Sequence, residues 1–109
     1  MNEIQELTAK IRQFTEERDW DQFHNPKDLA IALSLEASEL LEAFLWKSSE
    51  EAKLEKVREE LADVINYALL IADKYHLDVQ EIVMDKLARN AEKYPVEKAR
   101  GSAKKYNEL

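Results

Sequence analysis

Two pairs of acidic residues stand at helical spacing inside strongly apolar stretches of the sequence. They are Glu36 with Glu39, and Glu60 with Asp63. Residues three apart lie on the same face of a helix, so each pair places two carboxylates side by side. A carboxylate among apolar neighbours is costly unless a cation or hydrogen bonds compensate it, and converging carboxylates repel one another. The pattern therefore predicts a divalent cation held between two helices.

The available ligand types narrow the choice of ion. The chain has no cysteine, and neither histidine follows a glutamate by three residues, which disfavours zinc and di-iron sites. Oxygen-only ligands favour Mg²⁺, with Mn²⁺ as a substitute. Mg²⁺ keeps bound water and takes substrate phosphates as further ligands, and such a water is able to attack phosphorus. A nucleotide or polyphosphate ligand is expected. The alternative is that the acids are solvated helix positions or are paired with Lys or Arg.

Capping signals and apolar periodicity predict an all-α fold of four helices in a bundle-like arrangement. The first helix follows Asn2 and reaches about Asp19, the second spans residues 26–46, the third follows a capping box at Ser48 and reaches about Tyr75, and the fourth follows Asp78 and ends near Tyr94.

The second and third helices are expected to be antiparallel, because only about three residues connect them. At ~1.5 Å per residue, the first acidic pair lies ~16 Å before this turn and the second pair ~20 Å beyond it. The two pairs are thus level to within about one helical turn. This agreement supports a single shared site.

Length and composition predict one domain over residues 1–109, with residues 95–109 as an extended basic tail. The chain is 45% hydrophobic and 36% charged, which suffices for one core. No stretch approaches the roughly 20 apolar residues of a membrane span, and the first ten residues lack signal-peptide features. The absence of cysteine fits a reducing compartment. We expect a cytoplasmic protein with no membrane partner.

The charge is distributed unevenly along the chain. Residues 1–85 hold 9 basic and 20 acidic side chains, whereas residues 86–109 hold 7 basic and 3 acidic ones. An acidic protein is a poor general binder of nucleic acid, because neutralisation of phosphates dominates that affinity. A small phosphorylated ligand, held by a metal and a local basic cluster, fits this distribution better than a nucleic acid polymer.

Several stretches of the chain resemble the MazG-like all-α nucleoside triphosphate pyrophosphohydrolases, in particular the single-domain dCTP pyrophosphatase branch. The resemblance is carried by ERDWDQFHNP, ALSLEASELLEAFLWK, EELADVINYALLIA, KLARNAEKYP and ARGSAKKY, which follow one another through most of the chain. It implies that Glu36, Glu39, Glu60 and Asp63 bind Mg²⁺ and carry the catalysis. The implied reaction converts a nucleoside triphosphate, with dCTP or a related pyrimidine deoxynucleotide preferred, to monophosphate and pyrophosphate. The implied role is removal of unwanted nucleotides.

The same resemblance assigns further residues to the substrate. Trp20 and His24 are placed at the base pocket, and Trp46 and Tyr67 near the nucleoside. Ordinary packing at a helix end is the competing interpretation for each aromatic residue. The phosphate-binding candidates lie on the fourth helix and in the tail: Lys86, Asn90, Lys93, Arg100, Ser102 and Lys105. A solubilising basic surface is the alternative for these.

The third helix also predicts assembly. Between Leu61 and Ile71 it is apolar on nearly every side, and such a helix needs cover on every side. We therefore expect a homodimer or homotetramer, which the resemblance also implies. A helical nucleotide-binding or regulatory module without turnover, and a metal-free structural bundle, are the alternative functions.

Overall fold

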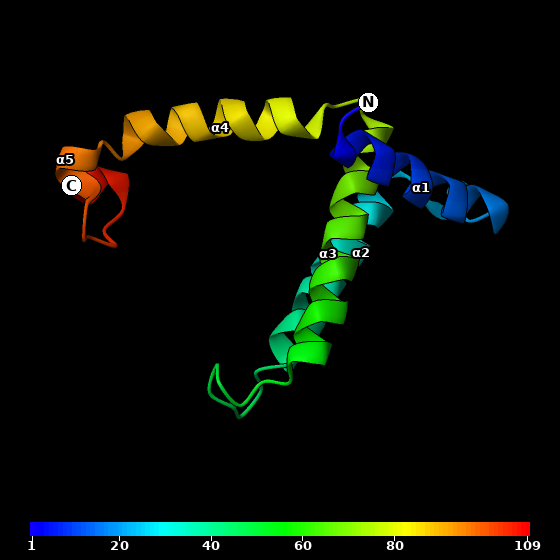
Figure 1. Cartoon of the computed structure of the whole chain (residues 1–109), viewed down its shortest axis with the longest axis horizontal. Helices are drawn as coiled ribbons and strands as arrows, with labels where there is room; N and C mark the ends of the chain where they lie inside the picture. The colour runs from blue at the N-terminus through cyan, green and yellow to red at the C-terminus, as the bar shows by residue number, and fades with distance from the viewer. The chain divides into compact units, whose positions relative to one another are not determined.

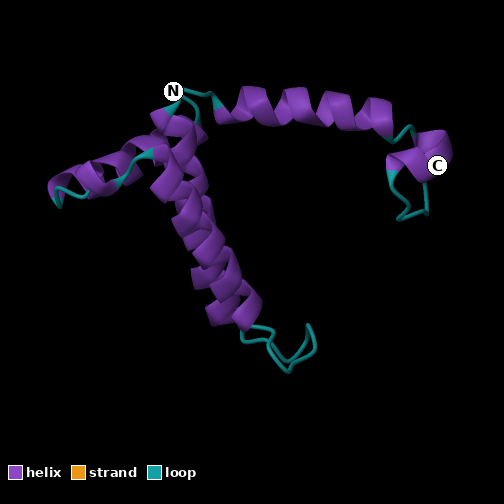
Figure 2. Ribbon diagram, turned by 180° about the vertical axis from the view of Figure 1, so that it is seen from behind, coloured by secondary structure: helices purple, strands orange, loops and turns teal.

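The computed structural model describes residues 1–109 and contains helices and loops only, without strands (Figure 2). The elements are α1 (Glu3–Glu17), a 3-10 turn (Asp21–Phe23), α2 (Pro26–Glu42), α3 (Leu54–Lys74), α4 (Val79–Lys93), α5 (Val96–Ala99) and a second 3-10 turn (Tyr106–Glu108). The all-α prediction is confirmed. The chain divides into two compact units, Met1–Leu77 and Asp78–Leu109, and each is described by itself. The single-domain assignment stays a prediction.

Side-chain caps start the first two helices where the sequence indicates. Asn2 accepts a hydrogen bond from the backbone N–H of Gln5, whose side chain accepts one from the N–H of Asn2. Asn25 accepts from the N–H of Asp28, with Pro26 at the first helical position. Each cap satisfies N–H groups that have no partner within the helix.

The first helix ends two residues earlier than expected. Asp19 adopts a left-handed conformation with φ of 56°, and the N–H of Trp20 bonds to the carbonyl of Thr15. A left-handed residue just beyond the last helical turn closes a helix in this way. His76 ends α3 by the same means, with φ of 55°.

The α2–α3 pair forms the main packing of the first unit, and the two helices lie side by side and antiparallel (Figure 1). Their connection is not the short turn that was expected. Helix α2 ends at Glu42 and α3 begins at Leu54, so residues 43–53 form a turn-rich loop. The capping box of Ser48 and Glu51 does form, but it closes an isolated turn in this loop instead of starting a helix. The two side chains satisfy the backbone N–H groups of Ser48 and Glu51, but the helix does not continue from this turn.

The core of the first unit is small, and charged pairs add to it. The buried apolar side chains are Leu29, Ala43, Leu69, Leu70 and Ala72. Helix α1 packs on α3, where Arg12 donates two hydrogen bonds to Asp73, at 2.8 and 2.6 Å. Lys74 also pairs with Asp21 of the first 3-10 turn. These contacts connect the N-terminal segment to the end of α3.

The apolar surface of α3 is only partly covered within the chain. Leu61 and Ile65 remain 45% and 44% exposed, whereas Leu69 and Leu70 are each 6% exposed. Oligomerisation stays a prediction.

The second unit corrects the expectation of an extended tail. Asp78 caps α4 through the N–H of Glu81, and α4 ends at Lys93 as predicted. The following residues then form the short helix α5 and the second 3-10 turn. The ring of Tyr106 makes an edge contact with Tyr94 and lies 5.0 Å from the ammonium of Lys93. Aromatic and cation–π contacts thus give the tail local order. No helix in the structure has the length and apolar character needed to span a membrane.

Replacing Arg12 with methionine is expected to lower the free energy of unfolding by about 1 kcal/mol, since the pair has two hydrogen bonds but is partly exposed. The Arg12 guanidinium lowers the pKa of Asp73, so this contribution is present above the ordinary pKa of the carboxyl group and disappears as pH falls through the lowered value. Urea unfolding at pH 7 and in acid measures both effects. A loss of equal size at both pH values would contradict the ion-pair explanation.

Candidate active site

The structure brings three of the four predicted metal ligands together. Glu36 of α2 and Glu60 and Asp63 of α3 each offer an oxygen within 4.8 Å of the others. The fourth predicted ligand, Glu39, is exposed and lies outside this group of three, and its role as a metal ligand stays a prediction. It remains a neighbour that interacts with both Glu36 and Glu60. We refer to Glu36, Glu60 and Asp63 as the carboxylate cluster.

The cluster forms although the loop between the helices is longer than expected. The pair Glu36–Glu39 is centred about 7 Å before the end of α2, and the pair Glu60–Asp63 about 11 Å after the start of α3, at ~1.5 Å per residue. The longer loop shortens both helices together, so the difference in depth remains within one helical turn. Antiparallel packing therefore still brings the pairs to the same level.

The environment shifts the pKa values of two cluster members in opposite directions. Partial burial raises the pKa of Glu36 to about 7, with contributions from hydrogen bonding to Glu39 and from repulsion by the other carboxylates. A hydrogen bond of 2.9 Å from Lys56 lowers the pKa of Glu60, which is 7% exposed. The cluster thus contains one carboxyl group that resists ionisation and one that a lysine holds ionised.

Two oxygens of the cluster fit a bound cation. The Oε2 atoms of Glu36 and Glu60 are buried and have no hydrogen-bond partner, while Oε1 of Glu60 accepts from Lys56. Buried polar atoms without a partner are rare because they lose their hydration. A hard divalent cation that prefers oxygen ligands would compensate both atoms and relieve the repulsion that raises the pKa of Glu36.

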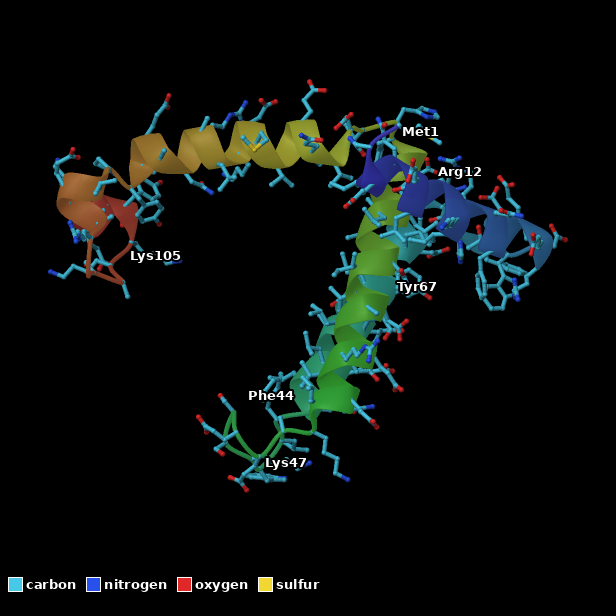
Figure 3. All side chains as sticks on the ribbon, in the orientation of Figure 1. Met1, Arg12, Phe44, Lys47, Tyr67 and Lys105 are labelled. Carbon is cyan, nitrogen blue, oxygen red and sulfur yellow. The ribbon has the colours of Figure 1, made fainter.

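A pocket of about 300 Å³ adjoins the cluster, and Asp63 belongs to both. Its lining residues come from α1, the loop after it and α3: Ile11, Phe14, Thr15, Trp20, His24, Asp63, Asn66, Tyr67 and Leu70. Three of the four residues expected near the nucleoside therefore share one pocket. Tyr67 lies part-way along α3, away from the loop marked by Phe44 and Lys47 (Figure 3).

The polar groups of the pocket have few partners. Nδ1 of His24 is buried without a hydrogen bond, and the His24 ring makes an edge contact with Tyr67 at 6.5 Å. Burial raises the pKa of Tyr67, and the nearby carboxylates raise it further, so its hydroxyl keeps its proton. These groups are available to a ligand that binds beside the cluster.

Trp46 is the nucleoside candidate that does not line this pocket. It lies in the loop 43–53, is 93% exposed, and has a left-handed conformation with φ of 59°. Two polar residues of the pocket, Asn66 and Thr15, were not expected from the sequence. Asn66 stands three residues after Asp63 in the α3 motif, and this spacing was the signal available for it.

The phosphate-binding candidates all belong to the second unit. Lys86 and Asn90 line one hollow on α4 and so lie on the same face of this helix. Lys93 lies over the ring of Tyr106. The remaining candidates follow α5: Arg100 caps its end, Ser102 accepts a hydrogen bond from the N–H of Lys104, and Lys105 precedes the last 3-10 turn.

Known proteins share both the sequence and the fold of this chain. The model of the MazG-like family matches residues 31–109. The dCTP pyrophosphatase 1 of Mus musculus is 39% identical over an alignment that covers 97% of this chain and 67% of that protein. The chain belongs to the MazG-like family. The dCTP pyrophosphatase 1 of Homo sapiens is 37% identical, with the same shares covered. A pyrophosphatase from Archaeoglobus fulgidus matches this MazG-like chain with a TM-score of 0.80 and 37% identity, over 87% of this chain and 94% of that one.

Membership of the MazG-like family confirms the predicted family and its enzyme class. These matches do not identify the bound metal or the preferred nucleotide.

Replacing Lys56 with methionine is expected to destabilise the metal-free MazG-like protein, because Glu60 loses its counter-charge inside an acidic cluster. Saturating Mg²⁺ should narrow this difference, since the cation then supplies the positive charge. Thermal and urea unfolding with and without Mg²⁺ measure it, with Lys53→Met as a control one turn earlier. An equal loss under both conditions would show that Lys56 acts independently of the cation.

Without metal, the protein should lose stability as pH rises from about 4.5 towards 7. The folded-state pKa of Glu36 is raised from 4.5 to about 7, so the folded state favours the protonated carboxyl and loses this advantage as the group ionises. Between pH 5 and pH 8, wild type should lose about 1–2 kcal/mol more than Glu36→Gln, a value reduced for partial solvation. Urea unfolding of both proteins tests this. Parallel pH profiles would refute it.

Proposed function

We propose that this protein is a Mg²⁺-dependent nucleoside triphosphate pyrophosphohydrolase. The observation that carries the proposal is the sharing of Asp63 between a carboxylate cluster and an aromatic-lined pocket. A cation at the cluster attracts phosphates, and the adjacent pocket has the rings needed to hold a base. One molecule that contains both groups is a nucleotide.

The reaction consists of hydrolysis of a phosphoanhydride. A water oxygen bonds to phosphorus, the bridge between the α and β phosphates breaks, and monophosphate and pyrophosphate leave. When bound, Mg²⁺ supplies charge neutralisation and lowers the pKa of coordinated water. Glu36, Glu60 and Asp63 would hold it. Glu39, which is exposed and interacts with Glu36, would accept the proton of the attacking water.

The proposed substrate is dCTP or a related pyrimidine deoxynucleotide, because the relatives from Mus musculus and Homo sapiens are both named dCTP pyrophosphatase 1. Trp20 and Tyr67 would contact the faces of the base, and His24 would bond to its edge. Mg²⁺ is proposed, with Mn²⁺ as a substitute, because the ligand set is composed of oxygens. The biological role would be the removal of unwanted nucleotides from the deoxynucleotide pool.

Phosphate recognition by the second unit belongs to the same proposal. Lys86, Asn90, Lys93, Arg100, Ser102 and Lys105 supply the cations and hydrogen-bond donors that a triphosphate requires. The shared hollow of Lys86 and Asn90 supports a common role for these two.

A homodimer or homotetramer completes the proposal. Leu61 and Ile65 of α3 are nearly half exposed. Helix α4 also exposes apolar side chains, namely Ile82, Val83 and Leu87. Contact with a second copy would remove this apolar surface from water. Trp46, which is almost fully exposed, would then be available to the site of a neighbouring subunit.

Release of pyrophosphate tests the proposed activity directly. Purified protein with Mg²⁺ should release pyrophosphate from dCTP, and Glu36→Gln and Glu60→Gln should each lower kcat/KM by about 100-fold or more, because each loses a charge that the cation requires. The control variant Glu55→Gln removes an exposed acid from the first turn of α3, the helix that also carries Glu60, and should retain activity. Circular dichroism checks the helical content of every variant. Wild-type rates in both cluster variants would refute the mechanism.

A further inference from the structure

Asn66 has a side chain that neither the metal site nor the fold explains. Between Leu61 and Ala72, every residue except Asp63, Asn66 and Tyr67 is apolar. The Asn66 side chain is half-buried on the wall of the pocket and forms no hydrogen bond within the chain. An apolar residue at this position would continue the stretch without a polar group to satisfy.

The Asn66 amide is open to the pocket. The buried polar atoms without a hydrogen-bond partner belong to His24, Glu36 and Glu60, so the oxygen and nitrogen of Asn66 keep contact with solvent. A polar side chain in a stretch of apolar ones adds less to packing than an apolar residue would, and proteins accept such departures mainly at functional sites. The amide is therefore available to form hydrogen bonds with a ligand in the pocket.

The position of Asn66 identifies the part of the ligand that it meets. It follows Asp63 by three residues and precedes Tyr67 by one, and all three line the same pocket. Phe14 and Trp20 stand on another wall with their rings edge to face at 5.7 Å. Aromatic rings contact the face of a flat ligand, whereas an amide offers in-plane hydrogen bonds to its edge.

We propose that Asn66 is a specificity-determining residue, whose amide pairs with the hydrogen-bonding edge of a pyrimidine base. This inference rests on the proposed nucleotide function. An amide presents one acceptor beside two donors, which complements the adjacent acceptor and amino donor of cytosine or the adjacent donor and acceptor of uracil and thymine. The volume of about 300 Å³ is at the lower end for ligand pockets and suits a single-ring base. Nδ1 of His24, buried without a partner, provides a second polar contact.

The test compares kcat/KM for dCTP, dTTP, dATP and dGTP in wild type and Asn66→Leu, which has a similar volume and no amide. Wild type should prefer a pyrimidine. The variant should lose about 10- to 100-fold for the pyrimidine nucleotides and much less for dATP and dGTP, so that the preference for a pyrimidine falls at least tenfold. Asn66→Ala provides the same test with a smaller side chain. Gln13→Leu, which removes an exposed amide from α1, should leave the preference unchanged.

Several outcomes would overturn the assignment. An equal loss for all four nucleotides would assign Asn66 a structural role, and an unchanged preference would remove it from recognition. A wild-type preference for purines would refute the pairing with a pyrimidine. If wild type releases no pyrophosphate from any nucleotide, the proposed function fails separately. Calorimetric dissociation constants for the same four nucleotides with Mg²⁺ then decide the role of Asn66, since a preference that Asn66→Leu leaves unaltered refutes it.

Discussion

Repulsion between carboxylates in the poorly solvated space between α2 and α3 is the constraint on which the rest of the first unit depends. Glu36, Glu60 and Asp63 place oxygens within 4.8 Å of one another, and partial burial together with the neighbouring carboxylates raises the pKa of Glu36 to about 7. A chain selected only for stability would fill this space with apolar side chains. Instead, Lys56 donates a hydrogen bond to one oxygen of Glu60, and the buried Oε2 atoms of Glu36 and Glu60 have no hydrogen-bond partner. The packing of α2 on α3 therefore holds a group of oxygens whose mutual repulsion a bound cation would relieve.

Helix α1 contributes to function by where it crosses α3. The Arg12–Asp73 pair holds it there, and this docking brings Phe14, Thr15 and Trp20 to the wall of the pocket beside Asp63. The ion pair is partly exposed and stabilises the fold only modestly. Its larger effect is to hold α1 against α3. Helix α1 and the loop after it supply Phe14 and Trp20 to the pocket, whereas α2 and α3 supply the carboxylate cluster.

The sequence predicted those features of the fold, such as helix caps, that depend only on residues close together in the chain. Asn2, Asn25 and Asp78 cap helices as expected, because a cap needs only the backbone a few residues ahead. Ser48 formed its capping box, yet the helix began only at Leu54, since capping does not determine whether a helix continues. Glu39 shares a face with Glu36, but the packing of α2 on α3 leaves it exposed. Asn66 and Thr15 became part of a pocket only through the crossing of α1 over α3, a contact between distant segments that periodicity does not contain.

Asp63 and Tyr67 belong to one uninterrupted helix, and this continuity has a mechanical consequence. Their backbones are separated by a rise of about 6 Å, fixed by the helical hydrogen bonds between them. In the proposed complex, the distance between the phosphate end and the base end of the bound molecule would therefore be set before binding. A change in this distance would require α3 to unwind between Asp63 and Tyr67, which no loop movement achieves. The rigid backbone would thus reject a molecule of the wrong length, even when each of its ends would bind well alone.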